Sequence, residues 1–330
     1  MSKTKHHLKT PAWRGLLLQY AGLLSALLLL IIAFSLMTDH FLSLTTLRTI
    51  SNQIPDAVML AVGMTLVMIV GGIDLSVGSV MALSGAMLGV CLAQWRWPLA
   101  PALAACLLTG LLCGLLNGLI TVRWKLPSFI VTLGMLEVAR GAAYLMTNSQ
   151  TMYIGAAVER LGAVSLFGLS LAFACAIVAV TVSQFALTRM VWGRYALAVG
   201  ANEEAARYTG VNPRPIKVAV FGLSGLLAAC AAVLQCARLS SADPNAGAGA
   251  ELQAIAACVI GGASLSGGRG SVVNTFFGVL IIAVLGAGLA QIGAQEPTRR
   301  FVTGCVIIAA VILDVYRARL ATASENLSAR

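Results

Sequence analysis

Seven of the 34 charged side chains (22 basic and 12 acidic) of this 330-residue chain lie in one segment, residues 189–217, where they could contact another protein. The segment contains seven charged residues, whereas the preceding stretch 161–187 contains none. These seven are Arg189, Arg194, Glu203, Glu204, Arg207, Arg214 and Lys217. The segment is either an ordinary amphipathic connector or a docking segment that passes force from a soluble partner to the rest of the chain.

The middle of this segment predicts one short capped helix from Asn202 to Gly210. The Asn202 side chain can accept hydrogen bonds from the free backbone N–H groups of a helix start. Glu203 and Glu204 then fall in the first turn and Arg207 in the last, where the helix dipole favours their charges. Gly210 suits the left-handed position after the last turn.

A glycine- and serine-rich pattern occurs twice, at an offset of 190 residues. The matching positions are Gly71, Gly72, Leu75, Ser76 and Gly78, which recur as Gly261, Gly262, Leu265, Ser266 and Gly268. Small residues permit sharp breaks in helices, and broken helices at corresponding positions of transporters tend to face the transport pathway. We therefore expect both copies, including Ser264 in the second, near a pathway. Chance similarity between Gly/Ser-rich segments is the alternative.

A few polar groups stand in otherwise apolar stretches. Asp74, in the first copy, either caps the following helix or contacts a polar permeant and takes part in gating. Glu137 and Arg140 are one helical turn apart, so the sequence predicts that they pair with each other. For Asn117, the sequence predicts a hydrogen bond to a neighbouring helix and not a ligand contact.

No pattern in the chain predicts an enzyme. Residues 262–269 resemble the start of a nucleotide-binding loop, but Arg269-Gly270 stands where Lys-Ser/Thr would be required. Residues 222–225 resemble an intramembrane serine-protease motif, but no histidine falls in an apolar stretch to act as base. The eight cysteines form no CxxC pair, so we expect packing roles for them, no metal site and no bound cofactor.

The composition predicts a membrane protein. Hydrophobic residues make up 59% of the chain and charged residues 10%, against roughly 25% charged in soluble domains. This balance excludes a soluble enzyme, a disordered protein and a secreted disulfide scaffold. Crossing a bilayer takes roughly 20 apolar residues. The predicted spans are 15–38, 57–72, 76–93, 97–122, 126–147, 161–188, 218–237, 252–266, 270–295 and 300–316.

The basic residues predict the orientation. Ten spans place both termini on one side of the membrane. With the termini in the cytoplasm, 15 of the 22 basic residues fall in cytoplasmic segments and 6 in outer ones, as the positive-inside rule expects. The net charge of +10 is then a topology signal and not a sign of nucleic-acid binding. We expect cytoplasmic tails at 1–14 and 317–330 around a single membrane domain, 15–316.

Five segments together resemble the permease subunit of bacterial ABC sugar importers, the ribose, arabinose, xylose and allose group. They are AVGMTLV at 61–67, GGIDLSVGS at 71–79, GRYALAVGANEEAARYTGVN at 193–212, ARLSSADP at 237–244 and ELQAIAACVIGGASLSGGRGS at 251–271. The resemblance covers about residues 15–316, and the combination of segments is much more specific than any one of them.

The resemblance implies an all-α, polytopic fold of about ten spans, of the type II kind found in vitamin-B12-type importers. Such permeases lie in the bacterial inner membrane, often as homodimers. A cytosolic ATPase subunit binds the ATP, and a periplasmic sugar-binding protein delivers the sugar. The residues expected to dock on the ATPase are Gly193, Gly200, Asn202, Glu203, Glu204, Arg207 and Gly210. The outward-facing Arg48, Arg160 and Arg238 would meet acidic groups of the binding protein.

Other functions stay open on the residues alone. The permeant could be another small polar solute, such as a quorum-signal furanose or a polyol. An ion-coupled secondary transporter would need buried acids or cation sites and would not need the segment 189–217.

Overall fold

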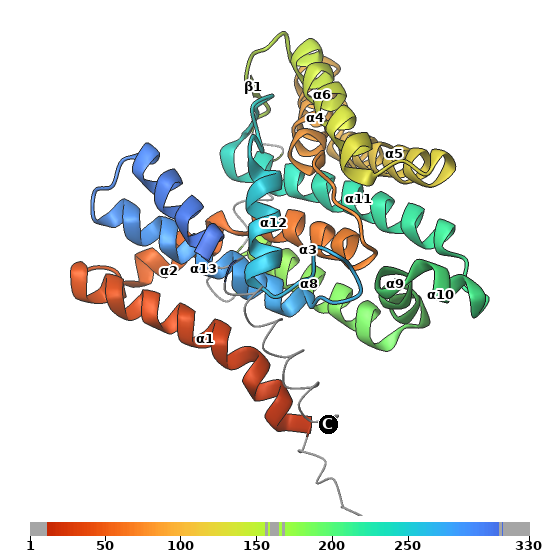
Figure 1. The fold of residues 1–330 in the computed structure, drawn as a ribbon. Helices are drawn as coiled ribbons and strands as arrows, with labels where there is room; N and C mark the ends of the chain where they lie inside the picture. The colour runs from red at the N-terminus through yellow and green to blue at the C-terminus, as the bar shows by residue number, and fades with distance from the viewer. Residues whose placement is uncertain (1–11, 156–157, 159–164, 167–168, 310–311, 313–330) are drawn as a thin grey trace, which may run out of the picture.

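The structure, a computed structural model, describes residues 12–155, 158, 165–166, 169–309 and 312. This part of the chain is almost entirely helical, in agreement with the predicted all-α class (Figure 1). The predicted tails at 1–14 and 317–330 lie almost wholly outside the described residues.

Among the described residues, six helices are long and apolar enough to cross a membrane. They are α4 (Val77–Gly89) continued by the π-helical turn η1 (Val90–Gln94), α5 (Leu99–Trp124), α6 (Ser128–Thr147), α8 (Leu171–Arg189), α11 (Pro213–Leu239) and α13 (Val272–Gln291). A seventh span results if α2 (Leu44–Gln53) and α3 (Pro55–Ile69), bent by 47° at Pro55, are counted together. The other helices are α1 (Ala12–Met37), α9 (Val191–Ala201), α10 (Glu203–Tyr208), α12 (Ala250–Ile260) and a helix at 296–309.

Several predicted boundaries are wrong. The span predicted at 252–266 ends at Ile260, because two glycines follow, and its 11 residues reach only about 16 Å. The span predicted from 161 begins at Leu171, where Ser170 caps the helix. The helix predicted from Asn202 to Gly210 is present as α10, and the same segment contains a further helix, α9, that the sequence pattern does not predict. Extended backbone at Met190 separates α8 from α9, directly after Arg189 at the end of the apolar run.

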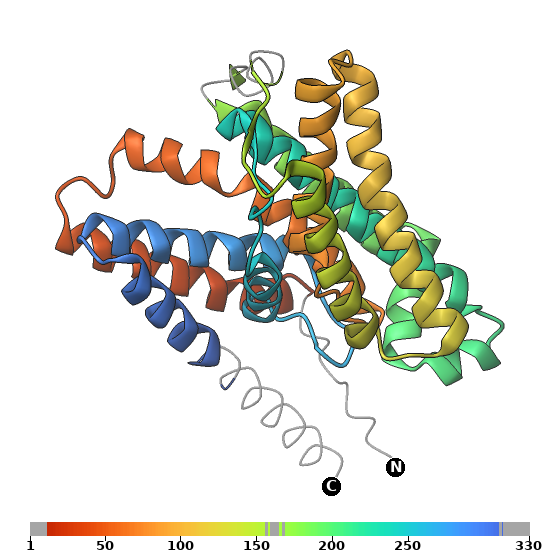
Figure 2. The ribbon, with the colours of Figure 1, turned by 90° about the horizontal axis from the view of Figure 1, so that it is seen from above.

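Helix α11 lies at the centre of the molecule and packs against α3, α4 and α5. Glycines bring α5 and α11 into backbone contact. A Cβ at Gly114 would overlap the Phe221 carbonyl oxygen, and one at Gly225 would overlap the carbonyl oxygen of Gly110. Figure 2 shows α4, α5 and α6 on one flank of the molecule and α1 beside α13 on the other.

Two short antiparallel ladders connect the helix ends. β1 (Met152–Tyr153), after α6, pairs with β4 (Ser241–Ala242), after α11, with Met152 opposite Ala242. β2 (Ser165–Leu166) and β3 (Leu169–Ser170) form a hairpin before α8. The β1–β4 ladder follows the C-terminus of α11, whereas α10 contacts its N-terminal part. These two ends of the molecule are called the β4 end and the α10 end below.

Candidate coupling and translocation sites

Helix α10 has the caps that the sequence predicts. The Asn202 side-chain oxygen accepts a hydrogen bond from the Ala205 N–H at 2.9 Å. Gly210 has a φ of 85°, and its N–H donates to the Arg207 carbonyl oxygen at 2.9 Å. A side chain is strained in this left-handed conformation, so the glycine ends the helix cleanly.

Glu203 joins α10 to α11. Its carboxylate accepts from the Arg207 guanidinium at 2.5 Å and from the Lys217 Nζ of α11 at 2.6 Å. Partial burial opposes ionisation of Glu203, but the hydrogen bond and charge of Lys217, together with Arg207, hold the pKa of this carboxyl below its ordinary value. The carboxylate is therefore ionised at neutral pH and fixes the orientation of α10.

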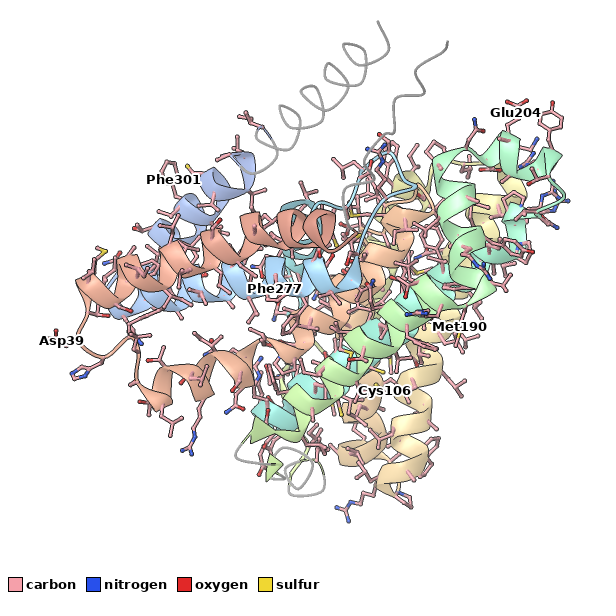
Figure 3. All side chains as sticks on the ribbon, turned by 90° about the horizontal axis from the view of Figure 1, so that it is seen from below. Asp39, Cys106, Met190, Glu204, Phe277 and Phe301 are labelled. Atoms are coloured by element: carbon pink, nitrogen blue, oxygen red, sulfur yellow. The ribbon has the colours of Figure 1, made fainter. Side chains whose placement is uncertain are left out.

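The outer face of α10 is open to a partner. Ala206 is the one buried residue of this helix. Tyr208 is 85% exposed, and Glu204 lies at a projecting corner of the molecule (Figure 3). Tyr208 is absent from the predicted docking residues, although its spacing of four from Glu204 places both on one face. An exposed tyrosine is a frequent anchor in protein interfaces.

Helix α9 carries the docking segment into the core. Gly193 lies at its start against the backbone of Leu187, and Gly200 lies near its end against the backbone of Ile69 and Gly268. A Cβ at Gly193 would overlap the carbonyl oxygen of Leu187, and a Cβ at Gly200 would overlap the carbonyl oxygen of Ile69. Glycine at both positions therefore lets α9 lie in direct backbone contact with its neighbours.

Helices α3 and α12 end in the same way. Gly71 has a φ of 75° and Gly262 a φ of 79°, and the N–H of each donates to the carbonyl oxygen three residues earlier. In the structure Gly71 thus corresponds to Gly262 and not to Gly261, an offset of 191 residues (262 minus 71). Ser76 and Ser271 stand at the N-cap positions of the next helices, α4 and α13. The sequence repeat therefore marks two helix breaks of the same design.

The two breaks and α9 meet in one junction of backbones. The Gly268 N–H donates to the Ile69 carbonyl oxygen at 2.9 Å. A Cβ at Gly267 would lie 2.7 Å from the Gly200 carbonyl oxygen and 2.9 Å from the Gly71 Cα. We call this contact of three segments the glycine junction. Because no side chain separates these backbones, α9 cannot shift far without displacing both breaks.

Asp74 is buried in a hydrogen-bonded cluster. Its carboxylate accepts from the Ser76 N–H at 3.0 Å, the Ser76 Oγ at 2.6 Å and the Ser224 Oγ of α11 at 2.9 Å. The Asn117 Nδ2 of α5 donates to the Ser76 Oγ at 2.9 Å. All four side chains are at most 1% exposed. This geometry supports the capping interpretation of Asp74 and the helix-to-helix hydrogen bond of Asn117.

Single polar side chains outside the predicted site also accept hydrogen bonds from the backbone at the two breaks. Ser128 and Thr132 of α6 accept from backbone N–H groups of the loop 71–76 at 2.9 and 3.0 Å. Gln184 of α8 accepts from the Val272 N–H at the start of α13 at 2.8 Å. Irregular backbone at membrane depth needs such hydrogen-bond partners. An isolated polar residue in an apolar span is therefore the sequence signal that could have predicted these three residues.

The remaining predicted pathway residues also lie at the breaks. Ser264 and Ser266 belong to the loop after α12, where the Ser264 Oγ accepts from the Ser266 N–H at 3.2 Å. Gly72 packs against the ring of Phe221, and Gly261 packs against the backbone of α13. None of these contacts by itself identifies a permeant site.

The predicted pair of Glu137 and Arg140 is wrong. The Arg140 Nη1 donates to the carbonyl oxygens of Pro244 and Ala246 at 2.7 and 2.8 Å, in the loop before α12. Two convergent carbonyl oxygens offer a guanidinium fixed acceptors that an exposed carboxylate does not. Glu137 is exposed and has no hydrogen bond or ion pair among the described residues.

The three arginines expected to meet a binding protein have different surroundings. Arg48 is exposed on α2. Arg238, at the end of α11, pairs with Asp56 at the start of α3 at 2.9 Å and keeps 34% of its side chain exposed. Arg160 lies outside the described residues. The Arg238–Asp56 pair joins α11 to α3 at the β4 end.

A groove of about 1040 Å³ lies between α2, α12, α13 and the helix at 296–309. Its wall carries hydroxyl and amide groups, among them Thr46, Thr49, Gln53, Gln253 and Gln291. Within the described residues, no three His, Cys, Asp or Glu side chains lie close enough to hold a metal ion. The lining also includes His40, Glu296, Arg299 and Arg300, so the groove offers both neutral and charged polar groups.

Comparisons with known proteins agree with this architecture. Residues 46–311 match the family described as the permease component of branched-chain amino acid transport systems. The chain is 37% identical over 311 residues to the ribose import permease protein RbsC of Escherichia coli K12, covering 92% of this chain and 95% of the relative.

Two further relatives are named for other sugars. The fructose import permease protein FrcC of Rhizobium meliloti is 34% identical over 308 residues, with coverage of 90% and 86%. The L-arabinose ABC transporter permease protein AraH of Azospirillum brasilense is 34% identical over 304 residues, with coverage of 91% and 89%. No solved structure matches the chain. Since the similarity extends over nearly the whole chain, the protein belongs to this family of multi-pass membrane permease components of ABC transport systems.

Proposed function

We propose that this chain is the permease subunit of an ABC importer that carries a monosaccharide across the bacterial inner membrane. In this proposal the chain has about ten spans in a type II arrangement, with both termini and the α10 end in the cytoplasm. The excess of basic residues in the segments assigned to the cytoplasm supports this orientation.

The glycine junction is the observation that carries the proposal. A cytosolic ATPase subunit would bind the open face of α10, including Glu204 and Tyr208. Closure of the ATPase would push α10, and α9 would pass the movement to the ends of α3 and α12 through Gly200, Gly71 and Gly267. This chain supplies no nucleotide-binding motif of its own, so ATP would be bound by the partner subunit alone.

A monosaccharide is the substrate class that the residues favour. A sugar is uncharged and rich in hydroxyl groups, so its path needs hydroxyl and amide partners and no ion site. The groove at the β4 end offers such groups, including Gln53, Gln253 and Gln291. The relatives named for ribose, fructose and arabinose support the same class.

The surface suggests how the other partners are arranged. A second copy would cover the side formed by α6, α12 and the helix at 296–309 (Figure 2). Lipid would cover the exposed leucine stripe of α5, formed by Leu108, Leu112, Leu116 and Leu119. A periplasmic binding protein would meet the β4 end, where Arg48 is exposed.

Reconstitution tests the proposal. The chain is placed in proteoliposomes with the ATPase and the binding protein of its transport system, and uptake of labelled ribose, arabinose, fructose and leucine is measured with and without ATP. We expect ATP-dependent accumulation of a monosaccharide. Uptake of leucine alone, or uptake of sugar without ATP or the ATPase, would overturn the assignment.

A further inference from the structure

Glu137 lies at the middle of a membrane-spanning helix, and its exposed side chain has no polar partner among the described residues. It is the tenth of the 20 residues of α6, so it lies about 15 Å from either end of the helix. An ionisable group at this depth is costly against lipid and marks a functional surface by default.

The face of α6 that carries Glu137 differs from a lipid-facing surface by this one carboxyl group. The buried side, which packs against α4 and α5, carries Thr132, Ala139, Ala143 and Thr147. The exposed side carries Glu137 between Gly134 and Gly141, one turn away in each direction, together with the exposed apolar side chains of Leu133 and Val138. The exposed stripe of neighbouring α5 consists of leucines such as Leu108 and Leu112. Glu137 is therefore a single carboxyl group, with open space over two glycines, in an otherwise apolar exposed face.

The two glycines leave space on either side of the carboxylate. A Cβ at Gly134 or Gly141 would meet nothing within 4 Å. Further along the same face, seven residues from Glu137, the Tyr144 hydroxyl donates to the Asn245 Oδ1 at 2.9 Å in an exposed position. Polar groups thus continue from the centre of α6 toward the β4 end.

α6 lies on the same side of the molecule as α12 and the helix at 296–309, two of the elements that line the groove (Figure 2). No residue of α6 lines the groove itself. A water-filled path along this side of the molecule would relieve the cost of an exposed carboxyl group at the membrane centre.

We propose that Glu137 contacts the permeating monosaccharide at the middle of the membrane. The inference rests on the proposed function. The oxygen atoms of the carboxyl group offer several acceptor sites for hydrogen bonds, and the hydroxyl groups of a sugar are donors that can use them. The open space over Gly134 and Gly141 gives a sugar ring room beside the carboxylate, and Tyr144 continues the track outward.

The first test measures water access at this position, independently of transport. E137C is labelled in proteoliposomes of the complete complex with a charged methanethiosulfonate, and the label is located by peptide mass spectrometry. The matched control is L112C, since Leu112 is 56% exposed at the middle of α5. We expect labelling of E137C, slowed by the transported sugar, and little labelling of L112C. Labelling of E137C as slow as that of L112C would overturn the proposal.

The second test measures the contact with the sugar. E137L should lower the uptake rate at low sugar concentration by about tenfold or more, because the hydrogen bonds to the permeant are lost. E137Q, which keeps one acceptor, should be affected less, and V138L controls for bulk on α6. ATP hydrolysis stimulated by the loaded binding protein should persist in all three variants.

The outcomes separate the two proposals. A wild-type complex that imports no monosaccharide refutes the proposed function, and the sugar contact falls with it. Normal uptake by the wild type and undiminished uptake by E137L refute the contact alone.

Discussion

At the scale of single residues, the buried hydrogen bonds of Asp74 allow a structural role of this residue to be distinguished from a role in gating. Asp74 accepts three hydrogen bonds from Ser76 and Ser224 in a site that excludes solvent. D74A would leave these donors unsatisfied, at a cost of about 1–3 kcal/mol. We expect less folded D74A in the membrane, measured by fluorescence-detected gel filtration, and less loss in D74N. Normal amounts of inactive D74A would instead assign Asp74 to gating.

Glu203 sets the pH dependence of the coupling helix. Its pKa is lowered in the folded protein, so it contributes stability that is present above the ordinary glutamate pKa of about 4.3 and is lost as the pH falls through the folded pKa. The protection of the α10 amides against hydrogen exchange, relative to their intrinsic exchange rate at each pH, should therefore stay constant from pH 8 to about 5. This protection should fall below the ordinary pKa range of a glutamate carboxyl group. E203Q should exchange faster at pH 7 and show no further acid transition. An acid transition of equal size in E203Q would contradict this assignment.

The same residue tests coupling. Changing Glu203 and Arg207 together to alanine removes the ion pairs that orient α10 on Lys217. ATP hydrolysis should continue while uptake falls, and the permease should stay in the membrane. R214A, at the exposed start of α11, breaks no ion pair among the described residues and is the control. Full transport by the double variant would be incompatible with the proposed role.

At the scale of elements, the contact between α5 and α11 depends on glycines. G114A would push a methyl group into the backbone of α11 and should destabilise the protein by about 1–3 kcal/mol. G134A and G286A add the same group where nothing lies within 4 Å, so they should leave stability unchanged or raise it slightly. Thermal unfolding in detergent measures the difference. Equal midpoints for G114A and G286A would show that the two helices do not approach this closely.

At the scale of the whole molecule, the glycine junction connects the coupling helix to both breaks. G200V should separate α9 from Ile69 and Gly268, so ATP hydrolysis should no longer drive uptake. L112V, in the exposed leucine stripe of α5, serves as the control for a substitution outside the junction and the groove. Uptake and ATPase activity are measured on the same vesicles, together with the thermal midpoint to confirm folding. Coupled transport by a folded G200V would show that the movement takes another route.

The sequence alone determined the class of the protein, its apolar helices, the caps of α10 and the presence of two glycine-rich breaks. These features depend on composition and on neighbours within a few residues, such as Asn202 with Ala205. Only the tertiary structure decided that Gly71, Gly200 and Gly267 meet, that Arg140 binds distant carbonyl oxygens, and that α9 exists. Contacts between segments more than 100 residues apart depend on how the helices pack, and local patterns carry no record of that packing.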